Sequence, residues 1–102
     1  MRKENLIREF EEEMKNLIPQ MSKAGYKTFT LERMVANRGY YETAKVLIAN
    51  TEGSGGFKKL AFEKNKPELT IEYLALKDKY SSIFTASELQ TANWKINEFS
   101  NF

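Results

Sequence analysis

The 102-residue chain contains no cysteine and no histidine. The missing cysteine excludes disulfides, thiolate zinc sites and thiol nucleophiles, and it suits a reducing cytosol. The missing histidine removes the most frequent general base and the most frequent transition-metal ligand. Among the remaining Ser, Thr, Lys and Glu residues, no spacing singles out a nucleophile with its base. We therefore expect no enzyme activity, no bound metal and no cofactor.

Long apolar runs are also missing. None approaches the ~20 residues that a membrane-spanning helix needs, and the first residues lead into an acidic segment rather than the apolar part of a signal peptide. We expect a soluble cytoplasmic protein that does not enter a membrane. The formal net charge of +2 neither demands nor excludes a nucleic-acid partner. With 41% hydrophobic residues, the chain can form one modest core, so we expect a single helical domain over residues 1–102.

Apolar residues recur at three- and four-residue steps, which predicts an all-α fold, a compact bundle of about five to six short helices. The first helix is expected over residues 3–18, with a glutamate-rich outer face. Pro19 should end or kink it, and Gly25 provides a stop shortly afterwards. Its apolar stripe comprises Leu6, Ile7, Phe10, Met14, Leu17 and Ile18, and Met21 would continue it.

Glycine and proline divide the rest of the chain. Gly39 should take a left-handed cap between two helices, one ending at Arg38 and one over residues 40–50. A short helix is expected around 57–61, after a glycine-rich linker. The segment 69–76 mixes strand and helix spacings, and we favour helix because a lone strand would have no partner.

The last helix has the clearest local pattern. Thr85 and Glu88 form a capping box, in which each side chain accepts the backbone N–H of the other residue. Phe84 and Leu89 occupy the positions of a hydrophobic staple. This pattern predicts structure and says nothing of function. The buried stripe of the helix is expected to comprise Leu89, Ala92, Ile96 and Phe99.

The middle of the chain is basic. Between Lys27 and Lys66 there are eight cations and four acids, a local excess of +4, with aromatic residues interleaved. This mixture suits phosphate contacts and stacking on bases, and it equally suits ordinary surface cations beside core aromatics. Trp94 is either a half-buried core residue or a binding hot spot. The candidate partner- or nucleic-acid-binding residues are Lys27, Arg33, Arg38, Lys45, Lys58, Lys59, Tyr40 and Trp94.

Two further acidic features could form a binding site, but we favour a structural role for both. The glutamates at 9 and 11–13 lie on one helix among cations, so we interpret them as a solvated helix face rather than a cation site. Glu72 is expected to form a structural pair with a nearby cation such as Lys66.

Four motifs together resemble a family of small uncharacterised prokaryotic proteins: residues 39–48, Gly-Phe-x-x-Leu at 56–60, Leu-Thr-Ile-Glu at 69–72, and Ile-Phe-Thr-x-x-Glu-Leu at 83–89. The resemblance covers about residues 26–100 and leaves the amphipathic N-terminal helix of residues 1–25 outside. It departs from the family pattern at Tyr40 and at 66–68. The resemblance implies a fold and supplies no catalytic residue.

Two hypotheses of function follow. The first is a non-catalytic protein-interaction module that binds a larger protein partner. Its most concrete version is a mobile-element or phage-encoded inhibitor of a bacterial nuclease or defence complex, of the anti-CRISPR type. The alternative is a nucleic-acid-binding helical module that uses the basic segment Lys27–Lys66. The helix, glycine turn and helix over residues 30–50 match a DNA-binding helix-turn-helix only in part, because the second helix has few groups that read bases. The sequence leaves the oligomeric state open.

Overall fold

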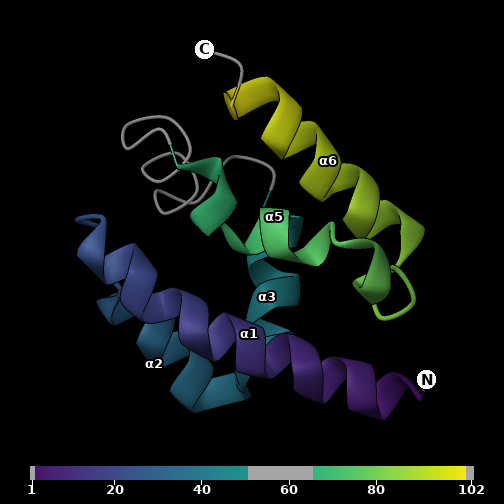
Figure 1. Ribbon diagram of the computed structural model, residues 1–102, viewed down its shortest axis with the longest axis horizontal. Coiled ribbons are helices and arrows are strands. Elements are labelled where there is room, and N and C mark those ends of the chain that lie inside the picture. Colours follow the sequence, from purple (N-terminus) through teal and green to yellow (C-terminus); the bar gives the residue numbers. More distant parts are fainter. Residues whose placement is uncertain (1, 51–65, 101–102) are drawn as a thin grey trace.

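The computed structural model describes residues 2–50 and 66–100, with side chains described up to residue 97. All regular elements within these ranges are helical, which confirms the all-α prediction. In Figure 1 the long helix α1 crosses the lower part of the molecule, α2 lies beside it, α3 lies behind, and α6 runs diagonally above α5. The elements are α1 (Lys3–Lys23), α2 (Phe29–Arg38), α3 (Tyr40–Ala49), the 3-10 helix η2 (Pro67–Leu69), α5 (Ile71–Ala75), the 3-10 helix η3 (Asp78–Tyr80) and α6 (Ala86–Ser100). The helix expected around 57–61 lies outside the described residues.

The prediction that the first helix ends at residue 18 is wrong, because α1 continues through Pro19 to Lys23. Proline inside a helix removes a backbone hydrogen bond and costs about 3 kcal/mol. Here Pro19 is exposed, while Ile18 and Met21 on either side of it are buried in the core. Their burial offsets the local cost and keeps the chain helical. The helix stops at Gly25, whose positive φ of 95° allows the backbone N–H of Tyr26 to bond back to the carbonyl of Met21.

The core is organised around Phe10, which is fully buried on α1. Its ring meets the rings of Tyr80 and Phe84 edge-on, each at a centroid distance of 5.2 Å. Tyr41 adds a third edge-on contact at 6.5 Å, and its hydroxyl donates to the carbonyl of Ile83. The aromatic cluster therefore joins α1 to α3 and to the segment that precedes α6.

Gly39 alone separates α2 from α3. Its φ of 84° is positive, as predicted, but its ψ of 168° is extended rather than left-handed helical. The prediction of a left-handed cap is therefore right for φ and wrong for ψ. A DNA-binding helix-turn-helix uses a turn of about 3–4 residues, so the one-residue junction favours the plain helical hairpin.

The segment 69–76 is helical, as favoured, but it is broken at Thr70. The Thr70 hydroxyl donates to the carbonyl of Pro67 at 2.7 Å and accepts the backbone N–H of Tyr73 at 3.2 Å. This one buried side chain ends η2 and caps α5. The strand-like spacing of the sequence thus reflects a kink between two short helices.

The capping box at the start of α6 is confirmed. The Thr85 backbone N–H donates to Glu88 Oε1 at 2.8 Å, and the Glu88 N–H donates to Thr85 Oγ1 at 3.1 Å. Glu88 also lies 3.5 Å from the Lys45 ammonium of α3. The cap therefore fixes where α6 begins and joins its first turn to α3.

Candidate interaction surfaces

Those of the predicted basic residues that the structure describes do not lie on one face. Lys58 and Lys59 lie outside the described residues, and Lys27 and Arg38 are exposed at the two ends of α2. Arg33 and Arg38 are five positions apart on that helix, so they point about 140° away from each other around its axis. The two arginines of α2 therefore cannot follow one phosphate backbone together.

Lys45 belongs to the framework of the fold. Its ammonium lies 3.5 Å from Glu88 and 5.3 Å from the centroid of the Tyr41 ring. Partial burial lowers the pKa of Lys45, but the charges of Tyr41 and Glu88 raise it by more, so the net pKa lies above the ordinary value. Tyr40 is half-buried and packs against the core. Lys45 and Tyr40 thus help to hold α3 in place.

Trp94 stands out on α6, with 46% of its surface exposed. It lies on the outer side of the helix, away from the fully buried Ala92. The intermediate exposure fits neither a pure core residue nor a freely solvated one. Trp94 therefore remains a candidate contact residue.

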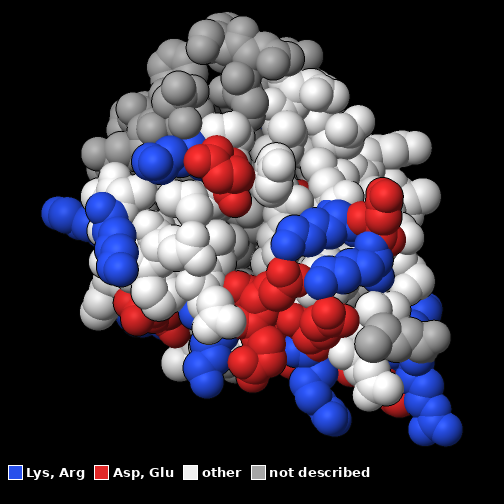
Figure 2. Space-filling model, in the orientation of Figure 1, with Lys and Arg blue, Asp and Glu red and all other residues white. Residues whose placement is uncertain are grey.

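The acidic face of α1 has structural partners, so the interpretation as a merely solvated face is corrected. Glu13 accepts from Lys77 at 2.8 Å and from the Tyr80 hydroxyl, and Glu9 accepts from Lys79 at 3.0 Å. Figure 2 shows acidic side chains with cations beside them at the lower centre of the molecule, where α1 runs in Figure 1. Burial raises the pKa of Glu13, but the hydrogen bonds from Lys77 and Tyr80 lower it by more, to below its ordinary 4.5.

Glu11 performs a different task. Its Oε2 accepts the backbone N–H of Tyr41 at 3.2 Å, at the first turn of α3. A carboxylate at this end of a helix satisfies a free backbone donor and favourably meets the helix dipole. α1 therefore supplies the cap that α3 lacks in its own sequence, because Gly39 has no side chain.

The least expected feature is a buried ion pair. Lys95 of α6 is 0% exposed and Glu72 of α5 is 3% exposed, and the ammonium lies 3.0 Å from Glu72 Oε2. Lys95 also donates to the backbone carbonyl of Leu47 on α3 at 2.7 Å. Burial raises the pKa of Glu72 and the nearby Lys95 only partly offsets this, so the net pKa lies above 4.5.

The expected structural pairing of Glu72 is thus present, but its partner is Lys95 and not Lys66, which is exposed. A sequence signal existed: Lys95 lies three residues after Ala92 and therefore on the buried side of α6. Through its bonds to Glu72 and to the carbonyl of Leu47, Lys95 thus connects α6 to α5 and α3 at one buried position. This arrangement supports a structural role, because both charged groups are enclosed.

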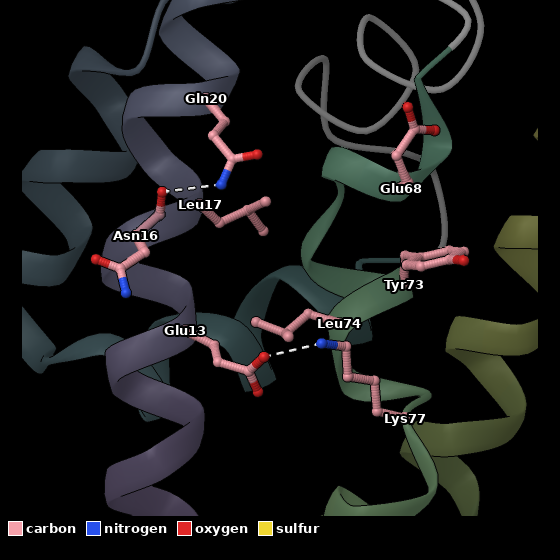
Figure 3. Close-up of a pocket in the computed structure, with 8 residues that line it drawn as sticks. All are labelled: Glu13, Asn16, Leu17, Gln20, Glu68, Tyr73, Leu74 and Lys77. Carbon is pink, nitrogen blue, oxygen red and sulfur yellow. Dashed lines mark hydrogen bonds and ion pairs between the residues drawn. The ribbon is translucent and has the colours of Figure 1, made fainter.

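A groove with a volume of about 290 Å³ runs between α1 and the η2–α5 segment. Leu17 and Leu74 point toward one another from its two walls, the Glu13–Lys77 ion pair bridges it, and the hydroxyl of Tyr73 points away from α1 (Figure 3). Within the described residues, no group of three or more Asp or Glu side chains could hold a metal ion. None of the helices in the described ranges combines the length and apolarity of a membrane crossing.

Comparison with known proteins gave no match: no family model, no curated protein and no solved structure is detectably similar to this chain. The resemblance described from the four motifs therefore stays a prediction. Evidence for a function therefore comes from the exposed residues of the fold.

Among the described residues, the outer face of α2 carries the most exposed of the large apolar side chains. Phe29 is 69% exposed, whereas α2 buries only Leu31 completely. The Arg33 guanidinium lies 5.7 Å from the centroid of the Phe29 ring, one helical turn along. The sequence predicts Arg33 as a contact residue but not Phe29, because an apolar residue at the start of an amphipathic helix normally faces the core.

Proposed function

We propose that this chain is a non-catalytic protein-interaction module that binds a larger protein through the outer face of α2. The observation that carries the proposal is the exposure of Phe29 beneath Arg33. Aromatic residues and arginine are enriched in protein interfaces and among the residues that dominate binding energy. Complete burial of an exposed Phe side chain in a partner would contribute about 1.5–3 kcal/mol.

The charges around Phe29 indicate what kind of partner would fit. Lys27 and Arg33, close to Phe29 in the sequence, outnumber the one acid between residues 27 and 33, Glu32, whose carboxylate accepts a hydrogen bond from Thr28. A partner with an apolar pocket and an acidic rim would therefore complement this face, because the pocket would take up the Phe29 ring and the rim would oppose the cations. The more specific version, an inhibitor of a bacterial nuclease or defence complex, is a proposal based on small size and the lack of recognisable chemistry.

Phe29→Ala should weaken this interaction by roughly 30-fold or more without unfolding the chain. Substitution of an exposed residue usually changes stability by no more than about 0.5 kcal/mol, whereas loss of a central interface residue costs about 2 kcal/mol or more, roughly 30-fold in affinity. The measurement is capture of a stoichiometric partner from host lysate, followed by titration of that partner. Val46→Ala, at another exposed apolar residue on α3, is the matched control. Failure to recover any stoichiometric partner, or equal capture by the Phe29 variant, would contradict the proposal.

The nucleic-acid alternative is tested by a salt titration with duplex and single-stranded oligonucleotides. We expect no binding at low salt, because the described cations do not form one stripe. Phosphate contacts would instead give an affinity that falls steeply with salt, with a log–log slope of about −0.9 per contact on duplex DNA. A steep slope that becomes shallower in Arg33→Gln and Arg38→Gln would support the alternative and count against the proposal.

A further inference from the structure

The groove between α1 and the η2–α5 segment has two ends of different chemistry (Figure 3). At one end the carboxylate of Glu13 accepts from the Lys77 ammonium at 2.8 Å and from the Tyr80 hydroxyl, so both of its oxygens already have donors. At the other end Gln20 stands on the α1 wall and Glu68 stands on the η2 wall. The two ends therefore offer a ligand different things: a closed ion pair at one, and polar groups from two walls at the other.

The oxygens of Gln20 and Glu68 have no donor among the described residues. Nε2 of Gln20 donates to the backbone carbonyl of Asn16 at 3.3 Å, and this bond turns Oε1 toward the groove (Figure 3). The Glu68 carboxylate is exposed and forms no ion pair within the described part of the chain. The lining residues include two acids and one cation, and Lys77 is paired with Glu13. The groove therefore keeps one uncompensated negative charge, which a cationic hydrogen-bond donor would complement.

The middle of the groove is apolar and aromatic. Leu17 and Leu74 belong to its two walls and are both largely buried, so they provide an apolar floor. Tyr73 is exposed, and Figure 3 shows its ring edge-on, with one face turned toward the end where Glu68 lies. The face of an aromatic ring attracts cations, most often the guanidinium of arginine. A ligand that matches this groove has an apolar stem and a flat cationic head.

We propose that the groove binds an arginine side chain of a partner protein. The methylene stem of the arginine lies along Leu17 and Leu74, as the stems of long cationic side chains do on apolar surface. The planar guanidinium directs its N–H donors outward in a fixed fork, so it can donate to Gln20 on one wall and to Glu68 on the other. Arginine suits the site better than lysine, because a guanidinium is more weakly hydrated than an ammonium and stacks on aromatic rings.

The size of the groove agrees with a single side chain. Its volume of about 290 Å³ lies at the lower limit of the roughly 300–1,000 Å³ of pockets that enclose whole small molecules. The site is also separate from the surface proposed on α2, since no residue of α2 lines the groove. The two surfaces differ in chemistry as well: the α2 face presents cations, whereas the groove takes up a cation.

Titration of the isotope-labelled full chain with Nα-acetyl-arginine methylamide, followed by heteronuclear NMR, tests the proposal. We expect saturable shifts of the backbone N–H signals of Leu17, Gln20, Tyr73 and Leu74, with a dissociation constant in the millimolar range for this single residue. The corresponding citrulline compound has nearly the same shape without the charge. It should bind at least about fivefold more weakly, because it loses the charge-assisted hydrogen bonds.

Glu68→Gln removes the uncompensated charge and keeps the size of the side chain, so it should weaken the arginine probe by about fivefold. Glu12→Gln, at an exposed glutamate of α1 outside the groove, is the matched control and should bind like the wild type. Circular dichroism checks that both variants are helical. The proposal fails if the arginine probe gives no saturable shifts at the groove, if citrulline binds equally well, or if the two variants bind alike. Tighter binding of the lysine compound would overturn the assignment to arginine.

Discussion

Lys95→Met is expected to lower the free energy of unfolding by about 3–5 kcal/mol, the usual cost of removing one partner of a buried ion pair. The substitution keeps the length of the side chain but leaves the Glu72 carboxylate enclosed without its cation. It also removes one of the two donors to the carbonyl of Leu47, which keeps the backbone N–H of Asn50. Urea denaturation followed by circular dichroism gives the difference directly.

The double variant Glu72→Met/Lys95→Met separates the two contributions. Replacing a whole buried pair with apolar residues of similar volume is often neutral or stabilising. We therefore expect the double variant to recover most of the stability that Lys95→Met loses. Additive losses in the double variant, or a single-variant loss no larger than the roughly 0.5 kcal/mol of a surface change, would contradict the role assigned to the pair.

The loss in Lys95→Met should also depend on pH. The pKa of Glu72 in the folded state already lies above 4.5 because of burial, and removal of Lys95 raises it further. A carboxyl group with a raised folded-state pKa contributes stability when it is protonated, and that contribution disappears as the pH rises through the folded-state pKa. Lys95→Met should therefore be most destabilising at neutral pH and least destabilising below the unfolded pKa of Glu72. A loss that is independent of pH would show that Glu72 is already neutral in the wild type.

Gly39→Ala should have the second-largest effect, a loss of about 1–3 kcal/mol. An added Cβ would meet nothing within 4 Å, so the whole cost is conformational. With φ 84° and ψ 168°, Gly39 occupies a region that is essentially restricted to glycine. Thermal and urea unfolding of the variant would measure this strain without interference from a steric clash.

Asparagine provides a control for this interpretation. It tolerates left-handed helical geometry, which is the usual geometry of a glycine in the terminating motif seen at Gly25. It has no such advantage at the ψ of Gly39. Gly39→Asn should therefore cost about as much as Gly39→Ala, whereas Gly25→Asn should cost less than Gly25→Ala. A clear rescue by asparagine at position 39 would mean that the junction relaxes to a left-handed cap.

Features encoded within a few residues could be predicted from the sequence. The apolar stripe of α1, the stop at Gly25 and the capping box of Thr85 and Glu88 each depend on spacings of three or four residues. The end of α1 at Pro19 could not be predicted in the same way. Whether the helix continues past Pro19 depends on the burial of Met21 in a core that includes segments far along the chain.

The contacts that matter most for the candidate surfaces are long-range. Lys95 meets Glu72 across 23 residues, and Glu11 meets Tyr41 across 30. Local pattern cannot choose between Lys66 and Lys95 as the partner of Glu72, because only the packing of α6 on α5 decides it. The exposure of Phe29 is of the same kind, since it depends on α2 packing mainly against α3.

The central position of Phe10 has a consequence for synthesis of the chain. Its ring partners Tyr80 and Phe84 are translated 70 and 74 residues later. At about 5–20 residues per second, Phe10 is synthesised roughly 4–15 s before those partners. Contacts between residues so far apart along the chain form only after a long loop has closed, and this closure costs entropy. Until the chain reaches residue 84, Phe10 therefore lacks two of the aromatic rings that enclose it in the folded core.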